Sequence, residues 1–103
     1  MEPPLTVTVM DEREHRVVLA VVGELDLATA PILEIALSNS AAREVILDLA
    51  GLQFMDSTGI RVLVETHNRL DATGRRLALR KCHSLPRRAL EVSGLGDFFH
   101  LER

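Results

Sequence analysis

Residues 45–70, which read VILDLAGLQFMDSTGIRVLVETHNRL, decide the fold of this chain of 103 residues. Residues 45–49 are a short, mostly branched apolar run, which is typical of a buried β-strand. After Ser57 the period changes, and one helical face is formed by Ile60, Leu63, Val64, His67 and Leu70. The stretch therefore predicts a strand, a connection and an amphipathic helix that ends near Gly74.

Two strands are predicted nearer the N-terminus. Residues 5–9 alternate apolar with polar side chains, as in an edge strand with one face in water. Residues 17–22 are continuously apolar, as in a central strand. We interpret the charged stretch from Asp11 to Arg16 as a turn, and we expect the two strands to form a hairpin.

A helix is predicted after the second strand. Residues 23–26 break the strand, and Asp26 or Thr29 can cap a helix whose first turn tolerates Pro31. The apolar stripe expected on this helix consists of Ile32, Leu33, Ala36 and Leu37.

The C-terminal third predicts one more strand and one more helix. Residues 76–80 place two leucines between arginine and alanine, as in a strand with one exposed face. A helix starts at Ser84, has Pro86 in its first turn and stops at Gly94. Residues 98–101 form a short apolar segment that can add a last strand. The predicted order is ββαβαβα, with this segment after it.

The predicted fold is a single α/β domain over residues 1–103. A chain of this length is expected to build one core. Right-handed crossovers place consecutive helices on the same side of a sheet, and the alternating outer strands leave one sheet face only partly covered. We therefore expect an open mixed β-sheet with the helices mainly on one face.

Composition is typical of a soluble domain. Apolar residues make up 47% of the chain and charged residues 26%. No apolar run approaches the roughly 20 residues that span a bilayer, and the N-terminus lacks the features of a signal peptide. Cys82 is the single cysteine, which excludes an intramolecular disulfide and suits a reducing cytosol. We expect a cytoplasmic protein that does not bind membranes.

Charge and aromatic content argue against nucleic-acid binding. The net charge is −3, and the only aromatic residues are three phenylalanines, too few for a stacking platform. Basic residues nevertheless cluster in the last third of the chain, namely Arg75, Arg76, Arg80, Lys81, Arg87 and Arg88. Such side chains usually decorate strand edges and helix faces, so we expect a solvated surface.

The junction at residues 54–60 has more polar groups than a helix start requires. Asp56, Ser57 and Thr58 all compete to cap the helix, although a cap needs only one oxygen. Gly59 costs roughly 0.5–1 kcal/mol relative to alanine in a helix, so close packing or close approach by another molecule must favour it. A phosphate is tolerated at such a helix start. From spacing alone, Ser57 is either a simple cap or an accessible site.

Several motifs in the correct order resemble the anti-sigma factor antagonists of the STAS family. They are GELDLATA at residues 23–30, the strand at 45–49 and FMDSTGI at 54–60, followed by ATG at 72–74 and LEVSGL at 90–95. The resemblance covers nearly the whole chain and implies a STAS-like fold. It also implies a bacterial switch protein that, when unphosphorylated, binds an anti-sigma factor, frees the sigma factor and so regulates transcription.

The resemblance also assigns roles and partners. Carried over by position, Ser57 is the phosphorylated residue. Glu24 and Asp26 are expected to lie near it, and the partner-binding surface is expected to include Glu24, Asp26, Asp56, Ser57, Thr58 and Gly59. The anti-sigma factor often doubles as the serine kinase, and a separate phosphatase acts on phospho-Ser57. We expect a monomer, and we expect the closing helix of many relatives to be a single turn or absent.

The alternatives from other functional classes fit poorly. An esterase nucleophile needs glycine two residues before Ser57, where Met55 stands, and Thr58 interrupts an aspartic protease signature. The four histidines and Cys82 lack the spacing of metal ligands. We therefore expect no enzyme activity, no metal and no cofactor. One alternative stays open, a constitutive or ligand-sensing STAS interaction module that is not regulated by phosphorylation.

Overall fold

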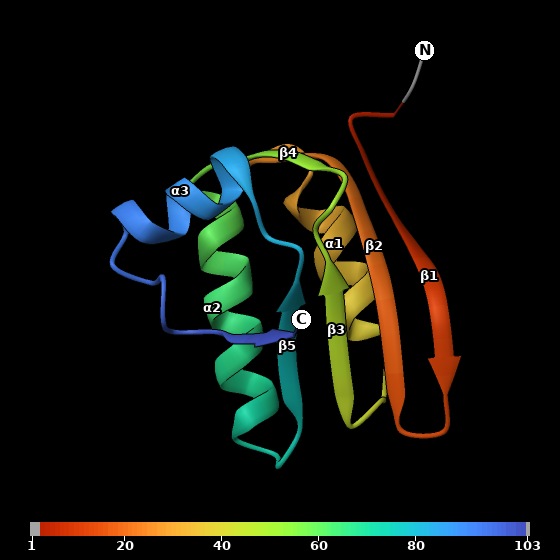
Figure 1. The fold of residues 1–103 in the computed structure, drawn as a ribbon. Helices are drawn as coiled ribbons and strands as arrows, with labels where there is room; N and C mark the ends of the chain where they lie inside the picture. The colour runs from red at the N-terminus through yellow and green to blue at the C-terminus, as the bar shows by residue number, and fades with distance from the viewer. Residues whose placement is uncertain (1–2, 103) are drawn as a thin grey trace.

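A computed structural model describes residues 3–102 and shows a mixed sheet with helices packed against it (Figure 1). The elements in chain order are β1 (Leu5–Arg13), β2 (Arg16–Leu25), α1 (Ala30–Ser38), β3 (Glu44–Asp48), β4 (Leu52–Met55), α2 (Ser57–Asp71), β5 (Arg76–Arg80), α3 (Ser84–Val92) and β6 (His100–Glu102). The predicted elements are all present, and β6 confirms the short last strand. None of the helices in residues 3–102 has the length and apolar character that a membrane span requires.

The sheet is mixed, as predicted. β1 and β2 form an antiparallel hairpin, and the strand order is β1-β2-β3-β5-β6, in which all neighbours after β1 are parallel. The charged stretch from Asp11 to Arg16 is not all turn, which corrects the sequence prediction. β1 continues to Arg13 and β2 starts at Arg16, because their ladder extends to this pair and leaves only Glu14 and His15 as the turn.

β4 is the element that the sequence prediction missed. β2 is ten residues long and β3 only five, so the C-terminal part of β2 has an edge that β3 does not reach. After β3 the chain makes a short turn, in which the Asp48 carboxylate accepts a hydrogen bond from the Ala50 amide at 3.0 Å, and it continues in the direction of β3. β4 then pairs in parallel with the free end of β2, where Leu25 lies opposite Met55.

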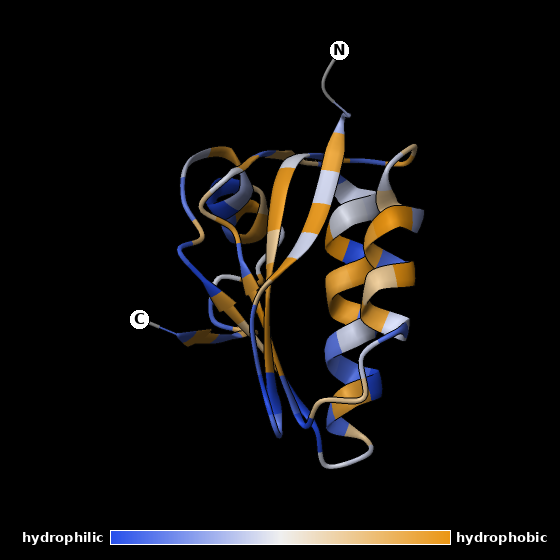
Figure 2. Ribbon diagram, turned by 90° about the vertical axis from the view of Figure 1, so that its right-hand side faces the viewer, coloured by the Kyte–Doolittle hydropathy of each residue, from blue (hydrophilic) through white to orange (hydrophobic). Residues whose placement is uncertain are grey.

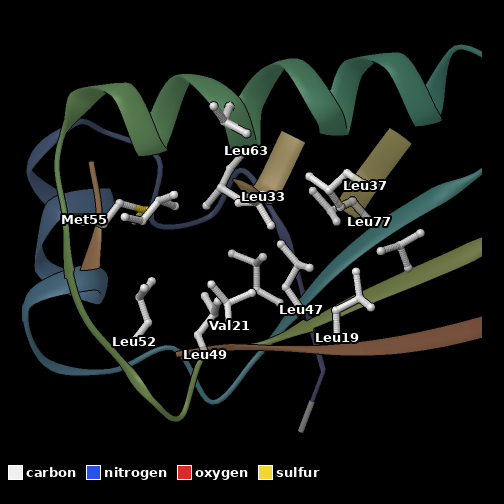
Figure 3. Packing of buried hydrophobic residues seen from close by; sticks show 14 of the residues in the cluster. Leu19, Val21, Leu33, Leu37, Leu47, Leu49, Leu52, Met55, Leu63 and Leu77 are labelled. Atoms are coloured by element: carbon white, nitrogen blue, oxygen red, sulfur yellow. The ribbon is translucent and has the colours of Figure 1, made fainter. Parts of the chain in front are cut away.

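The main core lies between the sheet and the two helices α1 and α2, which cover one face (Figures 1 and 2). Leucine and valine side chains of the strands point toward leucines of the helices (Figure 3). The fully buried side chains of this layer include Val21, Leu47 and Leu77 from the sheet and Leu33 and Leu63 from the helices. Helices mainly on one face are thus confirmed.

The buried faces of both helices differ from the predicted stripes. On α2 the buried residues are Gly59, Val62, Leu63, Thr66 and Leu70, whereas the predicted Ile60, Val64 and His67 are only partly buried. At His67 the reason is that the side chain packs against the chain's last segment. There the His67 ring lies 4.6 Å from the Phe98 ring. On α1 the predicted Ile32 is 40% exposed.

The opposite face of the sheet carries a small apolar row under charged side chains. Val18, Ile46 and Ala78 are neighbours in register and are buried, so the predicted exposed face of β5 is wrong at Ala78. Arg16 and Arg80 each donate to the same Glu102 oxygen at 2.6 Å. The hydrogen bond from Arg80, helped by the charge of Arg16, lowers the pKa of Glu102. These ion pairs join β6 to β2 across the sheet.

Candidate functional site

Two strand ends bring the predicted site residues together. Because β2 and β4 are parallel, their C-terminal ends lie side by side, with Leu25 opposite Met55. The next residues are Asp26 and Asp56, and the Asp56 amide donates to the Leu25 carbonyl oxygen at 3.2 Å. The structure therefore places two acidic residues that are far apart in sequence at adjacent turns of the same sheet edge.

Asp56 is the cap of α2. Its Oδ1 atom accepts hydrogen bonds from the Thr58 amide at 2.9 Å and from the Gly59 amide at 3.1 Å. Ser57 is the first residue of the helix and is exposed, and Thr58 is half-buried. The interpretation of Ser57 as a simple cap is therefore wrong, because Asp56 already fills that role. Ser57 is therefore an exposed residue that the helix cap does not use.

Asp26 makes the same kind of turn at the end of β2. Its Oδ1 atom accepts from the Ala28 amide at 3.0 Å and from the Thr29 amide at 3.1 Å. The buried Thr29 hydroxyl donates to the Glu24 carbonyl oxygen at 2.8 Å and accepts from the Asp26 amide at 2.9 Å. This leaves Leu27, the residue after Asp26, 74% exposed. Sequence reasoning did not single out Leu27.

Gly59 belongs to the packing of the site and not to its surface. The residue is buried, and a Cβ atom placed on it would lie 2.8 Å from Leu25 Cγ and 2.8 Å from Met55 Cγ. Close packing of α2 against the ends of β2 and β4 therefore explains the glycine. Of the other residues expected at the site, Glu24 is exposed, whereas Asp26 and Asp56 are half-buried by the turns that they stabilise.

An apolar groove of about 370 Å³ lies beside Ser57, between β4, the start of α2 and α3. Phe54, Leu85 and Val92 line it and are 40%, 58% and 77% exposed. Arg88 and Ser57 supply polar groups to its lining. Sequence reasoning missed this groove. The available signal was the spacing of Leu85, Ala89 and Val92, which forms a second stripe on the last helix beside the buried Pro86 and Leu90.

The basic cluster in the last third of the chain does not form one patch. Most of its members are engaged locally, as when Arg75 donates to the Ser40 and Ala42 carbonyl oxygens and Arg87 pairs with Glu91 at 3.7 Å. Within residues 3–102, Arg88 forms neither a salt bridge nor a side-chain hydrogen bond. Arg88 is thus an unpaired cation at the apolar groove.

A larger hollow of about 620 Å³ lies on a different face of α3, away from Ser57. Lys81, Cys82, Glu91 and Glu102 are among its lining residues. Burial raises the pKa of the Cys82 thiol, which favours the unreactive neutral form at neutral pH. In the described part of the chain, no three His, Cys, Asp or Glu side chains gather as metal ligands.

Comparisons with known proteins agree with this geometry. The sequence profile of the STAS domain matches residues 8–103. The anti-sigma-F factor antagonist RsfB of Mycobacterium tuberculosis is 31% identical over 100 residues, which cover 94% of this chain and 80% of RsfB. Two solved structures are also similar. An anti-sigma factor antagonist from Mycobacterium paratuberculosis has a TM-score of 0.81 at 27% identity, and the match covers 94% of this chain and 84% of that protein's chain. The anti-sigma factor antagonist SpoIIAA in its unphosphorylated form has a TM-score of 0.74 at 25% identity, and the match covers 95% of this chain and 89% of the SpoIIAA chain.

Proposed function

Because the chain belongs to the STAS domain family, we propose that it is an anti-sigma factor antagonist controlled by phosphorylation of Ser57. In its unmodified form it binds an anti-sigma factor of the serine-kinase type and frees the sigma factor. It acts by binding and not by catalysis, as a cytoplasmic monomer. The similarity to RsfB and to SpoIIAA, both named as anti-sigma factor antagonists, supports this role.

The observation that carries the proposal is that Ser57 is exposed and that the helix is capped by Asp56, without the Ser57 side chain. Asp56 satisfies the Thr58 and Gly59 amides, so a change at the Ser57 hydroxyl leaves these helix-starting bonds in place. The kinase transfers the γ-phosphoryl group of ATP to Ser57 Oγ, the bond to the bridging oxygen of ADP breaks, and the hydroxyl proton is released. A phosphatase hydrolyses the ester and restores the serine.

The charge of the phosphate explains how one group can end binding without unfolding the domain. Phosphoserine adds about −1.5 to −2 charges beside the Asp56 carboxylate. A partner carboxylate about 4 Å away would be repelled by roughly 4 kcal/mol per charge pair at an effective dielectric of 20, and by less when salt screens it. A loss of about 2.7 kcal/mol is already a hundredfold loss of affinity.

The partner surface that we propose consists of the two turns and the groove between β4 and α3. It includes Glu24 and Asp26 at the first turn and Asp56, Ser57 and Thr58 at the second, with Gly59 holding the second turn against the sheet. Leu27 adds an exposed apolar side chain to the same edge.

Two variants test the proposal by binding to the serine-kinase anti-sigma factor encoded in the same genome, measured by titration calorimetry. Ser57→Ala is expected to bind as the unmodified chain does and to remain bound when ATP is added. Ser57→Asp is expected to bind roughly tenfold more weakly or worse, because it adds a charge at the interface. Ser38→Asp is the matched control, since Ser38 is an exposed serine at the far end of α1, and it should leave affinity unchanged.

The alternative is a constitutive or ligand-sensing STAS module. Equal affinity of the Ser57→Ala, Ser57→Asp and parent chains would contradict phosphorylation control and favour that alternative. Intact mass measurement after incubation with the kinase and ATP gives a second readout. One phosphoryl group on the parent chain and none on Ser57→Ala is the expected result.

A further inference from the structure

Two elements meet at the groove beside Ser57 and bring opposite chemistry to it. Ser57 lines the groove from the start of α2, and Arg88 lines it from α3. The neighbouring Arg87 pairs with Glu91, but no described residue pairs with Arg88. An arginine without a described partner therefore lines the same hollow as the serine that we propose is phosphorylated.

Two of the amides at the start of α2 are not free to bind the phosphate. At a free helix N-terminus, exposed amides are the usual donors to a phosphate. In this chain the Thr58 and Gly59 amides already donate to Asp56 Oδ1 at 2.9 and 3.1 Å. A phosphate on Ser57 also lies next to the Asp56 carboxylate, which repels it. A cation would offset this repulsion, and the groove offers Arg88.

We propose that Arg88 binds the phosphate of phosphorylated Ser57 within the same chain and so links α2 to α3 across the groove. The inference rests on the proposed function, which supplies the phosphate. A guanidinium suits this task because its planar donors match two phosphate oxygens at once.

The pairing changes what the partner meets. In the unmodified chain the groove is open and Arg88 is available to a carboxylate of the anti-sigma factor. In the phosphorylated chain the same arginine is occupied, and its side chain lies over the apolar floor near Phe54. Phosphorylation then removes a binding groove as well as adding negative charge.

The test is a ³¹P NMR titration of chains that carry phosphoserine at position 57, installed by genetic encoding so that no kinase is needed. A nearby cation stabilises the dianionic phosphate and lowers its second pKa, which is about 6 for free phosphoserine. Arg88→Gln is expected to raise this pKa by roughly half a unit relative to the phosphorylated parent. Arg87→Gln is the matched control, because Arg87 pairs with Glu91, and it should leave the pKa unchanged.

A second readout follows the backbone amides of Ala89 and Val92. Phosphorylation should shift these resonances in the parent chain and leave them in place in Arg88→Gln. An unchanged phosphate pKa in Arg88→Gln, or an equal rise in both arginine variants, would overturn the pairing. Thermal unfolding of the unphosphorylated Arg88→Gln chain should match the parent, since Arg88 is exposed and pairs with no described residue.

The outcomes also separate this inference from the proposed function. A phosphorylated chain that binds the anti-sigma factor as tightly as the unmodified chain contradicts the proposed function, whatever the titration shows. A phosphorylated chain that loses affinity, with no change of phosphate pKa in Arg88→Gln, leaves the proposed function standing and rejects the role of Arg88.

Discussion

The turn after β2 and the turn after β4 use one device for two purposes. In each, an aspartate Oδ1 accepts hydrogen bonds from the second and third amides that follow it, at 3.0 and 3.1 Å for Asp26 and at 2.9 and 3.1 Å for Asp56. In each, the residue directly after the aspartate is exposed, and it is Leu27 in the first turn and Ser57 in the second. The aspartate provides the structure, which leaves the next residue free for binding.

The third residue of each turn shows how the two turns differ. Thr29 fills its place with a hydroxyl that bonds to the Glu24 carbonyl oxygen and the Asp26 amide. Gly59 fills the equivalent place with no side chain at all, because Leu25 and Met55 occupy that space. Beyond the aspartate hydrogen bonds that both turns share, the first turn is held by the Thr29 hydroxyl and the second by direct packing of the helix on the sheet.

Substitution at this third position gives the largest expected effect. Gly59→Val forces a branched side chain into the contact with Leu25 and Met55, and the free energy of unfolding should fall by about 3 kcal/mol. Thr29→Val keeps the volume but loses the buried hydroxyl bonds, and it should cost about 1–2 kcal/mol. Urea denaturation of both variants measures the two values. A smaller loss for Gly59→Val than for Thr29→Val would contradict the packing explanation.

Replacement of Asp26 and of Asp56 tests whether the two aspartates stabilise their turns equally. Asp56→Ala and Asp26→Ala should each lower the free energy of unfolding by about 1 kcal/mol, because each leaves two amides without an acceptor. Asp71→Ala is the control, since Asp71 is exposed at the last turn of α2, where a negative charge gives no benefit. If only one of the two aspartates mattered for stability, the comparison of the turns would fail.

The smallest expected effect on stability is at Leu27, where only binding should change. Leu27→Ser should weaken binding to the anti-sigma factor roughly tenfold, because it removes an apolar side chain from the proposed interface. Stability should not change, since Leu27 is mostly exposed. Met10→Ser is the matched control, because Met10 is also an exposed apolar residue and lies in the half of β1 next to the hairpin turn, away from Leu27. Equal affinities for the two variants would remove Leu27 from the interface.

Local patterns predicted the elements well because period and strand composition depend on near neighbours. The hairpin, the helices on one face of the sheet and the polar junction at Asp56, Ser57 and Thr58 all follow from such patterns. β4 was missed because its pairing depends on the extra length of β2, which no local pattern of residues 52–55 contains. The buried face of α2 was predicted about one residue away from its observed position. The apolar period of the sequence cannot distinguish the side of the helix that faces the sheet from the side that α3 and the last segment cover.

The site was predicted in part for the same reason. The junction at Asp56 and Ser57 is local, so the sequence singled it out, although it did not decide which oxygen caps the helix. The groove and Arg88 depend on where α3 docks against β4, which only the assembled fold determines. Leu27 was passed over because its exposure results from the hydrogen bonds of Asp26 and Thr29.

The parallel arrangement of β2, β3 and β5 also divides the molecule into two ends. The turns that carry Leu27 and Ser57 lie at one end, whereas the hairpin turn at Glu14 and His15 lies at the other (Figure 1). A fluorescent reporter or a fused module grafted into that hairpin turn would sit a full strand length from the recognition end. The architecture thus gives an engineer, and gives evolution, a place to add new parts while the switch continues to operate.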